Sequence, residues 1–225
     1  MSSLLDTLRG QLTEGRIQQM AQTVGADHDK VQRAVNAALP LLVGGLAKNA
    51  TASDDAAQSL SEALENDHDG SLLDNVGDLF NAIPERAAKG GLGALTSMAG
   101  SMIGGNVDSR SLDGSGILSH VLGGRLRAVE EGIARMSGLD RQQVRGLLEI
   151  IAPMAMAGLG RMKREENLDA SGVAQLLDEE RQAVEENTPE MSSGTLFDLL
   201  DQSDDGTIID DVSRLGSQFG NLFGK

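Results

Sequence analysis

The sequence has no cysteine, no tryptophan and no tyrosine, and only four of its 225 residues are phenylalanine. Without cysteine there are no disulfide bonds, no thiolate nucleophiles, and no zinc or iron–sulfur sites with cysteine ligands. The scarcity of aromatic residues predicts a core built from Leu, Ile, Val, Met and Ala. Proline is also rare, at four residues, whereas 28 glycines predict many short turns between helices.

Basic residues are few as well: 19 Lys and Arg stand against 34 Asp and Glu, which gives a formal net charge of −15. A chain of this charge is repelled by nucleic acids and anionic membranes unless a local basic face overrides the whole. No signal peptide is expected, and the longest uncharged stretch, residues 90–106, is too weakly hydrophobic to span a membrane. With the absence of cysteine, this predicts a cytoplasmic protein that has no membrane partner and for which nucleic acid is a disfavoured partner.

A segment of the chain occurs twice. Residues 20–48 align without a gap with residues 133–161, and the paired residues include Gly25 with Gly138 and Pro40 with Pro153. Self-similarity at a constant offset indicates a duplicated structural unit. The sequence therefore predicts two divergent repeats of one helical unit, 113 residues apart.

Each repeat is predicted to be a pair of helices. In the first, a helix ends at Gly25 in a left-handed cap, and the Asp27 side chain caps the next helix. Pro40 lies inside that second helix, where we expect a kink or a restart at a cost of about 3 kcal/mol. The buried stripe of the first repeat is predicted to comprise Val31, Ala34, Val35, Ala38, Leu42 and Leu46. In the second repeat it comprises Ile133, Val144, Leu147, Leu148, Ile151, Met154 and Leu159.

A shorter helix is expected after each pair, over residues 54–64 and 171–178, because residues 57–60 resemble residues 174–177. Asp-Gly turns begin at residues 69, 113 and 205, and we expect a Ser or Thr hydroxyl to cap the helix after each turn. After the last turn, the apolar residues between 208 and 223 fall on one helical face, which predicts a helix that packs on the protein.

No stretch of useful length alternates as a β-strand does, so the predicted fold class is all-α. The predicted organisation is a first helical repeat over residues 1–83, a Gly/Ser-rich linker over residues 84–112, and a second repeat over residues 113–225 that includes a C-terminal amphipathic helix.

Three motifs together resemble a known family: the Gly-x-Asp-x-x-x-Val hairpin that starts at Gly25, the run Ala-Leu-Pro-Leu-Leu-Val-Gly-Gly-Leu-Ala at residues 38–47, and the Asp-Gly-Ser-x-Leu-Asp turn at residues 69–74. They resemble the YidB-like bacterial family of uncharacterised function (domain of unknown function 937), from about residue 17 to the end. The resemblance implies an all-α fold with a homeodomain-like helix arrangement and no attached reaction. Residues 114–124 look like the family's Gly-rich connector between helical halves.

The helix pairs also fit a DNA-binding helix-turn-helix, which needs a small residue, a glycine and an apolar residue around its turn. The second repeat is the better candidate because it carries Arg135, Arg141 and Arg145. A helical surface of solvated arginines accounts for the same residues, and Asp27 and Asp29 would repel phosphates in the first repeat. DNA binding is therefore an alternative function, not the leading one.

A calcium-binding structural protein is a second alternative. Asp201, Ser203, Asp205 and Thr207 occupy the first, third, fifth and seventh positions of an EF-hand-like loop. However, Val212 stands where the bidentate glutamate belongs, and residues 65–76 repeat the same incomplete pattern. An Asp-Gly turn before a helix with acids in its first turn, which the helix dipole favours, explains both segments without a metal.

No motif predicts catalysis or a cofactor. His28, His68 and His120 lack the spacing of a zinc helix and are expected to be exposed, and neither a Gly-x-Ser-x-Gly elbow nor a phosphate loop is present. The leading hypothesis is a non-enzymatic protein that acts by self-association or by binding a protein partner. Methionines suit adaptable interfaces, which suggests a role for Met154, Met156 and Met162.

Overall fold

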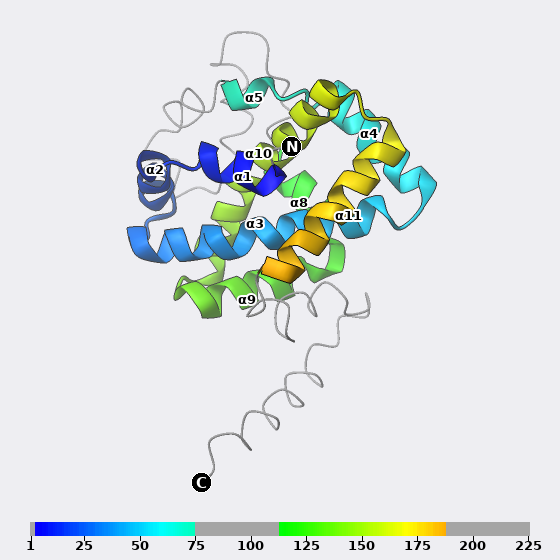
Figure 1. The fold of residues 1–225 in the computed structure, drawn as a ribbon. Coiled ribbons are helices and arrows are strands. Elements are labelled where there is room, and N and C mark those ends of the chain that lie inside the picture. The colour runs from blue at the N-terminus through cyan, green and yellow to red at the C-terminus, as the bar shows by residue number, and fades with distance from the viewer. Residues whose placement is uncertain (1–2, 75–112, 188–225) are drawn as a thin grey trace.

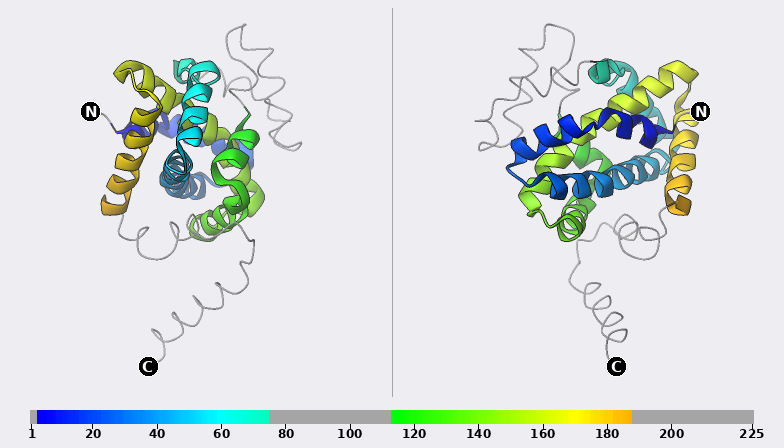
Figure 2. Two further views of the ribbon diagram at one scale, coloured as in Figure 1. Left: turned by 90° about the vertical axis from the view of Figure 1, so that its right-hand side faces the viewer. Right: turned by 60° about the vertical axis from the view of Figure 1, so that its left-hand side comes forward.

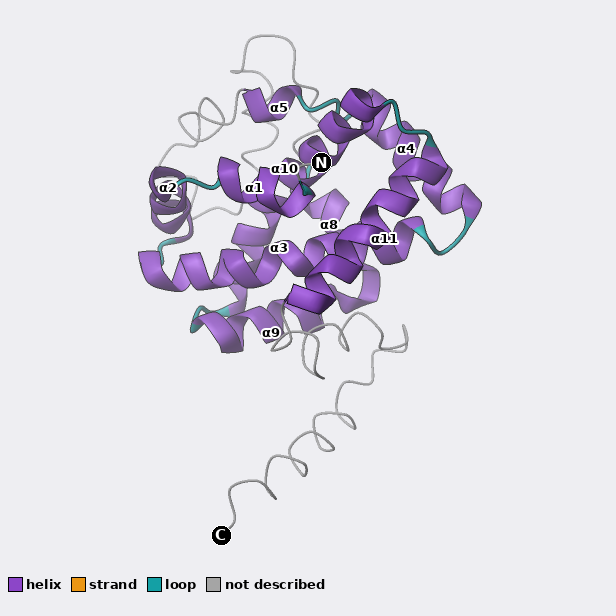
Figure 3. Cartoon of the chain, viewed as in Figure 1, coloured by secondary structure: helices purple, strands orange, loops and turns teal. Residues whose placement is uncertain are grey.

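The computed structural model describes residues 3–74 and 113–187, and within these ranges every regular element is a helix (Figures 1 and 3). The all-α prediction is therefore confirmed. The helices of the first range are α1 (Leu4–Gln11), α2 (Glu14–Val24), α3 (His28–Ala50), α4 (Asp54–Asn66) and α5 (Ser71–Asp74). Those of the second are α8 (Gly114–Leu122), a 3-10 turn (Gly123–Arg125), α9 (Leu126–Ser137), α10 (Arg141–Glu166) and α11 (Ala170–Asn187).

The predicted helix ends are confirmed in both repeats. α2 ends at Gly25, which has a φ of 65°, and the Asp27 side chain accepts hydrogen bonds from the first backbone amides of α3. α9 ends likewise at Gly138, which has a φ of 75°, and Asp140 forms a capping box with Gln143 at the start of α10. Glycine adopts these positive φ values without the steric cost that a Cβ brings.

Of the two outcomes expected at the prolines, a kink or a restart, the restart does not occur. α3 continues through Pro40 and α10 through Pro153, and both prolines are buried. A proline costs its helix about 3 kcal/mol, whereas burying one leucine side chain stabilises by about 1.5–3 kcal/mol. The many buried apolar residues on either side of each proline therefore outweigh the lost hydrogen bond.

Both repeats contribute to one apolar core, and every residue of the two predicted stripes is buried in it. α3 contacts α9, α10 and α11 as well as the helices of its own repeat. In the left view of Figure 2, α3 is seen nearly end-on near the centre, with α4, α8 and α11 around it. The two repeats are thus parts of a common core.

Contacts between the repeats occur in reciprocal pairs. The Gln143 side chain donates to the backbone oxygen of Gly25 at 3.1 Å, and the residue equivalent to Gln143, Lys30, lies against Gly138, the equivalent of Gly25. In the same way, Arg33 donates to the backbone oxygen of Ser137 at 3.2 Å. Gly146 is the equivalent of Arg33, and Val24 is the equivalent of Ser137. These two residues are also neighbours. Reciprocal contacts of this kind are the mark of a twofold, isologous interface.

The same relation extends to α1 and α8, which the sequence analysis did not pair. At the offset of 113 residues, Leu8 of α1 is equivalent to Val121 of α8. A Cβ added at Gly45 of α3 would lie 3.1 Å from Val121 Cγ1, and one added at the equivalent Gly158 of α10 would lie 3.1 Å from Leu8 Cδ2. Each repeat therefore begins with a short helix that packs against a glycine on the other repeat's long helix.

This pairing corrects the interpretation of residues 114–124 as a Gly-rich connector. Residues 114–122 form α8, and Leu118 and Leu122 are fully buried in the core. The prediction was wrong because the glycines Gly114 and Gly116 are sites of close approach rather than of chain flexibility: a Cβ at Gly114 would lie 2.0 Å from the Glu149 backbone oxygen.

α11 is also longer than the predicted helix over residues 171–178, whereas α4 matches its prediction closely. Glu180 lies beyond the predicted end of α11 and is buried. Its carboxylate accepts hydrogen bonds from the Leu4 backbone nitrogen at 2.8 Å and the Ser3 hydroxyl at 2.7 Å. Glu180 thus caps α1 from a distant part of the sequence.

The predicted Ser cap is wrong at the second Asp-Gly turn, where Asp113 is the N-cap of α8. The Asp69 carboxylate accepts from the Ser71 backbone nitrogen at 3.0 Å, and the Asp113 carboxylate accepts from the Gly116 backbone nitrogen at 2.9 Å. A charged carboxylate is a stronger acceptor than a hydroxyl and therefore accepts the capping hydrogen bond. The turn at residue 205, the linker at 84–112 and the apolar face at 208–223 lie outside the described residues, so these predictions and the domain boundaries stay predictions.

Candidate functional site

The three arginines of the predicted DNA-binding surface lie on the α9–α10 hairpin, and each has carboxylates nearby. Arg141 is 3.6 Å from Glu131 and 3.7 Å from Glu130, and Arg135 is 3.9 Å from Glu131. Arg145 is 3.2 Å from Glu149 and 3.8 Å from Glu130. A phosphate would have to compete with these carboxylates. The DNA-binding alternative stays a prediction, and these ion pairs do not favour it.

Glu130 differs from the other acids of this group because it is only 4% exposed. Its Oε1 atom has no hydrogen-bond partner among the described residues. Burial raises the pKa of the Glu130 carboxyl, and the nearby Arg145 and Arg141 guanidinium groups only partly offset this. The ionised form of Glu130 is therefore less favourable in the folded chain than in the unfolded chain.

We expect Glu130→Gln to raise the melting temperature at pH 7 and to leave it nearly unchanged near pH 4. Between the ordinary pKa of a glutamate and the raised pKa of Glu130, the folded state binds more protons than the unfolded state, so stability falls as the pH rises. Glutamine carries no such cost. Thermal melts of both proteins from pH 4 to pH 8 measure this. The expectation is contradicted if the melting temperature of the variant minus that of wild type is lower at pH 7 than at pH 4.

The weaker of the two calcium-like segments, residues 65–76, uses its described acids for packing against α10. Glu65 forms an ion pair with Lys163, Asp69 with Arg164 at 3.7 Å, and Asp74 with Arg161. Hydrogen bonds from Ser71 hold the pKa of Asp69 below its ordinary value. Over residues 3–74 and 113–187, no group of three or more His, Asp or Glu residues is placed to hold a metal ion. Asp201, Ser203, Asp205 and Thr207 lie outside the described residues.

Two expectations about individual side chains are wrong. His68 was expected to be exposed but is 6% exposed, because the chain after α4 packs tightly onto α10 near Gly160. Met154, Met156 and Met162 were expected to serve adaptable interfaces but are buried in the core. The uncharged run at residues 150–160 was a signal for the burial of Met154 and Met156, whereas Met162 lies between Arg161 and Lys163.

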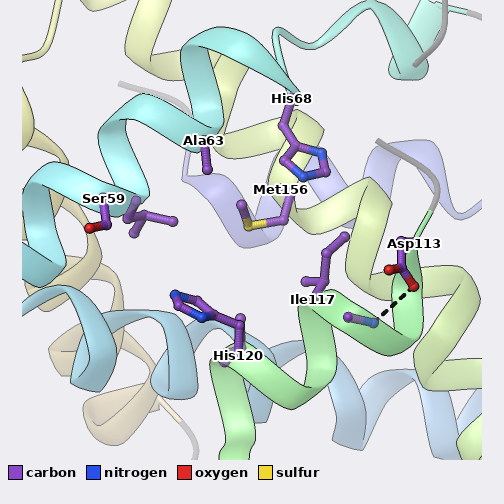
Figure 4. Close-up of a pocket in the computed structure, with 10 residues that line it drawn as sticks. Ser59, Ala63, His68, Asp113, Ile117, His120 and Met156 are labelled. Carbon is purple, nitrogen blue, oxygen red and sulfur yellow. Dashed lines mark hydrogen bonds between the residues drawn. The ribbon is translucent and has the colours of Figure 1, made fainter. Parts of the chain in front are cut away.

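A cavity of about 320 Å³ opens between α4, α8 and α10 (Figure 4). Its walls are mostly aliphatic and include Leu60 and Ala63 of α4, Ile117 and Val121 of α8, and Met156 of α10. Its polar lining residues are Ser59, His68, Asp113 and His120. Sequence reasoning missed this cavity because its two histidines stand 52 residues apart, on segments that only the tertiary fold brings together.

His68 is the most unusual of these polar groups. Burial lowers the pKa of the imidazole, and the nearby Asp67 only partly offsets this, so the ring is neutral at pH 7. No described residue hydrogen-bonds to Nδ1 of the ring. The cavity can hold an apolar molecule against a neutral imidazole. Over the described residues, no helix is both long and apolar enough to cross a membrane.

Neither the curated proteins nor the solved structures include a match to this chain. The family described as "Bacterial protein of unknown function (DUF937)" matches twice, over residues 6–102 and again over residues 85–162. The two matches together span more than two thirds of the chain, and a double match agrees with the internal repeat. The resemblance drawn from the hairpin and turn motifs is confirmed, and the chain belongs to this bacterial DUF937 family.

Proposed function

We propose that this protein is not an enzyme and that it acts by association, either with a second copy of itself or with a protein partner. The non-enzymatic part rests on the sequence, which has no cysteine nucleophile and no motif for a cofactor or a catalytic serine. The association part rests on one surface feature, the exposed end of α9.

Met136 carries this proposal. It lies next to the last residue of α9 and is 50% exposed, and it is the one large hydrophobic side chain in the described ranges that is exposed to this extent. The other large apolar side chains in these ranges are buried or half-buried, so the exposed thioether stands out. Methionine is flexible and polarisable, which suits it to a protein interface. The neighbouring Arg135 and Arg141 would give such an interface a charged rim.

Met136→Asp is expected to weaken association at least about tenfold, because a carboxylate would have to be desolvated in the contact. Sedimentation equilibrium over a wide concentration range measures self-association, and a pull-down with the purified full-length chain as bait measures partner binding. The matched control is Gln22→Asp, which places the same charge at the exposed equivalent of Arg135 on α2. A strict monomer at every concentration, together with a pull-down that recovers nothing, would contradict the proposal.

A further inference from the structure

We propose that the cavity between α4, α8 and α10 is a binding site for a small, uncharged, apolar molecule that carries one hydrogen-bonding group. The cavity volume of about 320 Å³ lies at the small end of the roughly 300–1,000 Å³ typical of ligand pockets. This inference is independent of the proposed association function, because the cavity residues and Met136 are different sets.

A difference between the two repeats creates the cavity. In the second repeat, the Glu180 side chain of α11 is buried between α11 and α1. It accepts hydrogen bonds from Ser3 and Leu4. From the alignment of residues 57–60 with 174–177, the equivalent of Glu180 on α4 is Ala63, which lines the cavity. A methyl group cannot reach α8 as the Glu180 carboxylate reaches α1. The first repeat therefore leaves open a space that the second repeat fills.

A second substitution between the repeats enlarges this space. Ser59 of α4 also lines the cavity, and its equivalent on α11 is Leu176, which packs against the core. The two small residues lie one helical turn apart on the same face of α4. Both positions thus carry a smaller side chain on α4 than on α11.

His68 supplies the hydrogen-bonding group of the proposed site. The residue is 6% exposed, and the ring points into the space between α4, α8 and α10 (Figure 4). Its Nδ1 atom has no partner among the described residues and is itself covered, so only Nε2 could meet an occupant of the cavity. A neutral imidazole has one donor and one acceptor nitrogen, so its ring can hydrogen-bond to a hydroxyl or N–H group of a bound molecule.

The charges around the cavity select an uncharged occupant. Asp113 places a carboxylate at one edge, and the whole chain carries a formal net charge of −15, so an anion is disfavoured. His68 stays neutral because burial lowers its pKa, and so it offers no positive charge to an anion. The aliphatic walls disfavour any ion that must lose its hydration shell. An apolar body with a single hydroxyl or N–H group fits all three conditions.

The test uses three probes with one apolar body: 2-naphthol, 2-naphthoate and naphthalene. The full-length chain is labelled with ¹³C at the methionine methyl groups, and the Met156 resonance is assigned by Met156→Leu. We expect 2-naphthol to shift the Met156 resonance saturably and to bind at least tenfold more tightly than 2-naphthoate. His68→Leu is expected to weaken 2-naphthol binding about tenfold and to leave naphthalene binding nearly unchanged.

Filling the cavity is the control for its location. The double substitution Ser59→Leu with Ala63→Leu places larger side chains in the space and is expected to abolish the Met156 shift. Gln58→Leu with Glu62→Leu adds two leucines to the same helix at exposed positions outside the cavity, and this protein is expected to bind as wild type does. No Met156 shift up to the solubility limit of 2-naphthol, equal binding of 2-naphthoate, or undiminished binding by the filled protein would each overturn the proposal.

Discussion

Replacing Gly160 by alanine is expected to lower the melting temperature by roughly 6–12 °C, which corresponds to about 3 kcal/mol or more in a protein of this size. A Cβ at this position would lie 1.7 Å from the His68 backbone oxygen and 2.9 Å from its carbonyl carbon. Both atoms belong to the backbone, so no side-chain rotation relieves the overlap. The chain between α4 and α5 would have to move away from α10.

The control for this change is Gly15→Ala in α2, where no atom lies within 4 Å of the added Cβ. Alanine is favoured over glycine within a helix by roughly 0.5–1 kcal/mol, so this substitution is expected to be neutral or slightly stabilising. Calorimetric or circular-dichroism melts of both variants measure the difference. A Gly160→Ala protein that melts within a degree or two of wild type would show that the His68 segment is not seated on α10.

Gly114→Ala is expected to give the second largest loss, about 2–3 kcal/mol. The added Cβ would lie 2.0 Å from the Glu149 backbone oxygen and 2.8 Å from its Cα, so the first turn of α8 would be pushed off α10. The loss is smaller than at Gly160 because Gly114 is the first residue of α8, where a short helix can tilt.

Melting experiments together with amide hydrogen exchange measure this second effect, and faster exchange is expected to concentrate in α8. Gly10→Ala in α1 is the matched control, since nothing lies within 4 Å of a Cβ at Gly10 and α1 is the equivalent helix of the other repeat. If Gly114→Ala and Gly10→Ala have the same stability, the close contact between α8 and α10 is absent.

Local signals in the sequence predicted the parts of the fold that depend on neighbouring residues. Gly25 and Gly138 end their helices with positive φ, and Asp27 caps α3 as expected. These effects depend on a residue's own backbone and on amides two or three positions away, so one sequence is enough to find them.

Features that depend on distant partners were missed. The predicted helix over residues 171–178 ended before Glu180, whose partners, Ser3 and Leu4, are about 176 residues away. Gly114 was assigned to a flexible connector because nothing in its local sequence indicates the approach of Glu149. His68 and His120 were treated as isolated for the same reason, although both line one cavity.

The two repeats pack reciprocally, and the cavity is a local departure from that relation. The contact between Gln143 and Gly25 has its equivalent in the contact between Lys30 and Gly138. The contact between Val121 and Gly45 has its equivalent in that between Leu8 and Gly158. Positions 22 and 29 of the first repeat have their equivalents at positions 135 and 142 of the second. A twofold relation requires the distance from 22 to 142 to equal the distance from 29 to 135.

Spin-label distance measurements test this relation most directly, and the absence of native cysteine makes the labelling clean. One protein carries labels at Gln22→Cys and Gln142→Cys, and the other at Asp29→Cys and Arg135→Cys; all four positions are exposed, and the pairs are related by the offset of 113 residues. Reciprocal packing predicts that the two distance distributions coincide. Two clearly separated mean distances would contradict it.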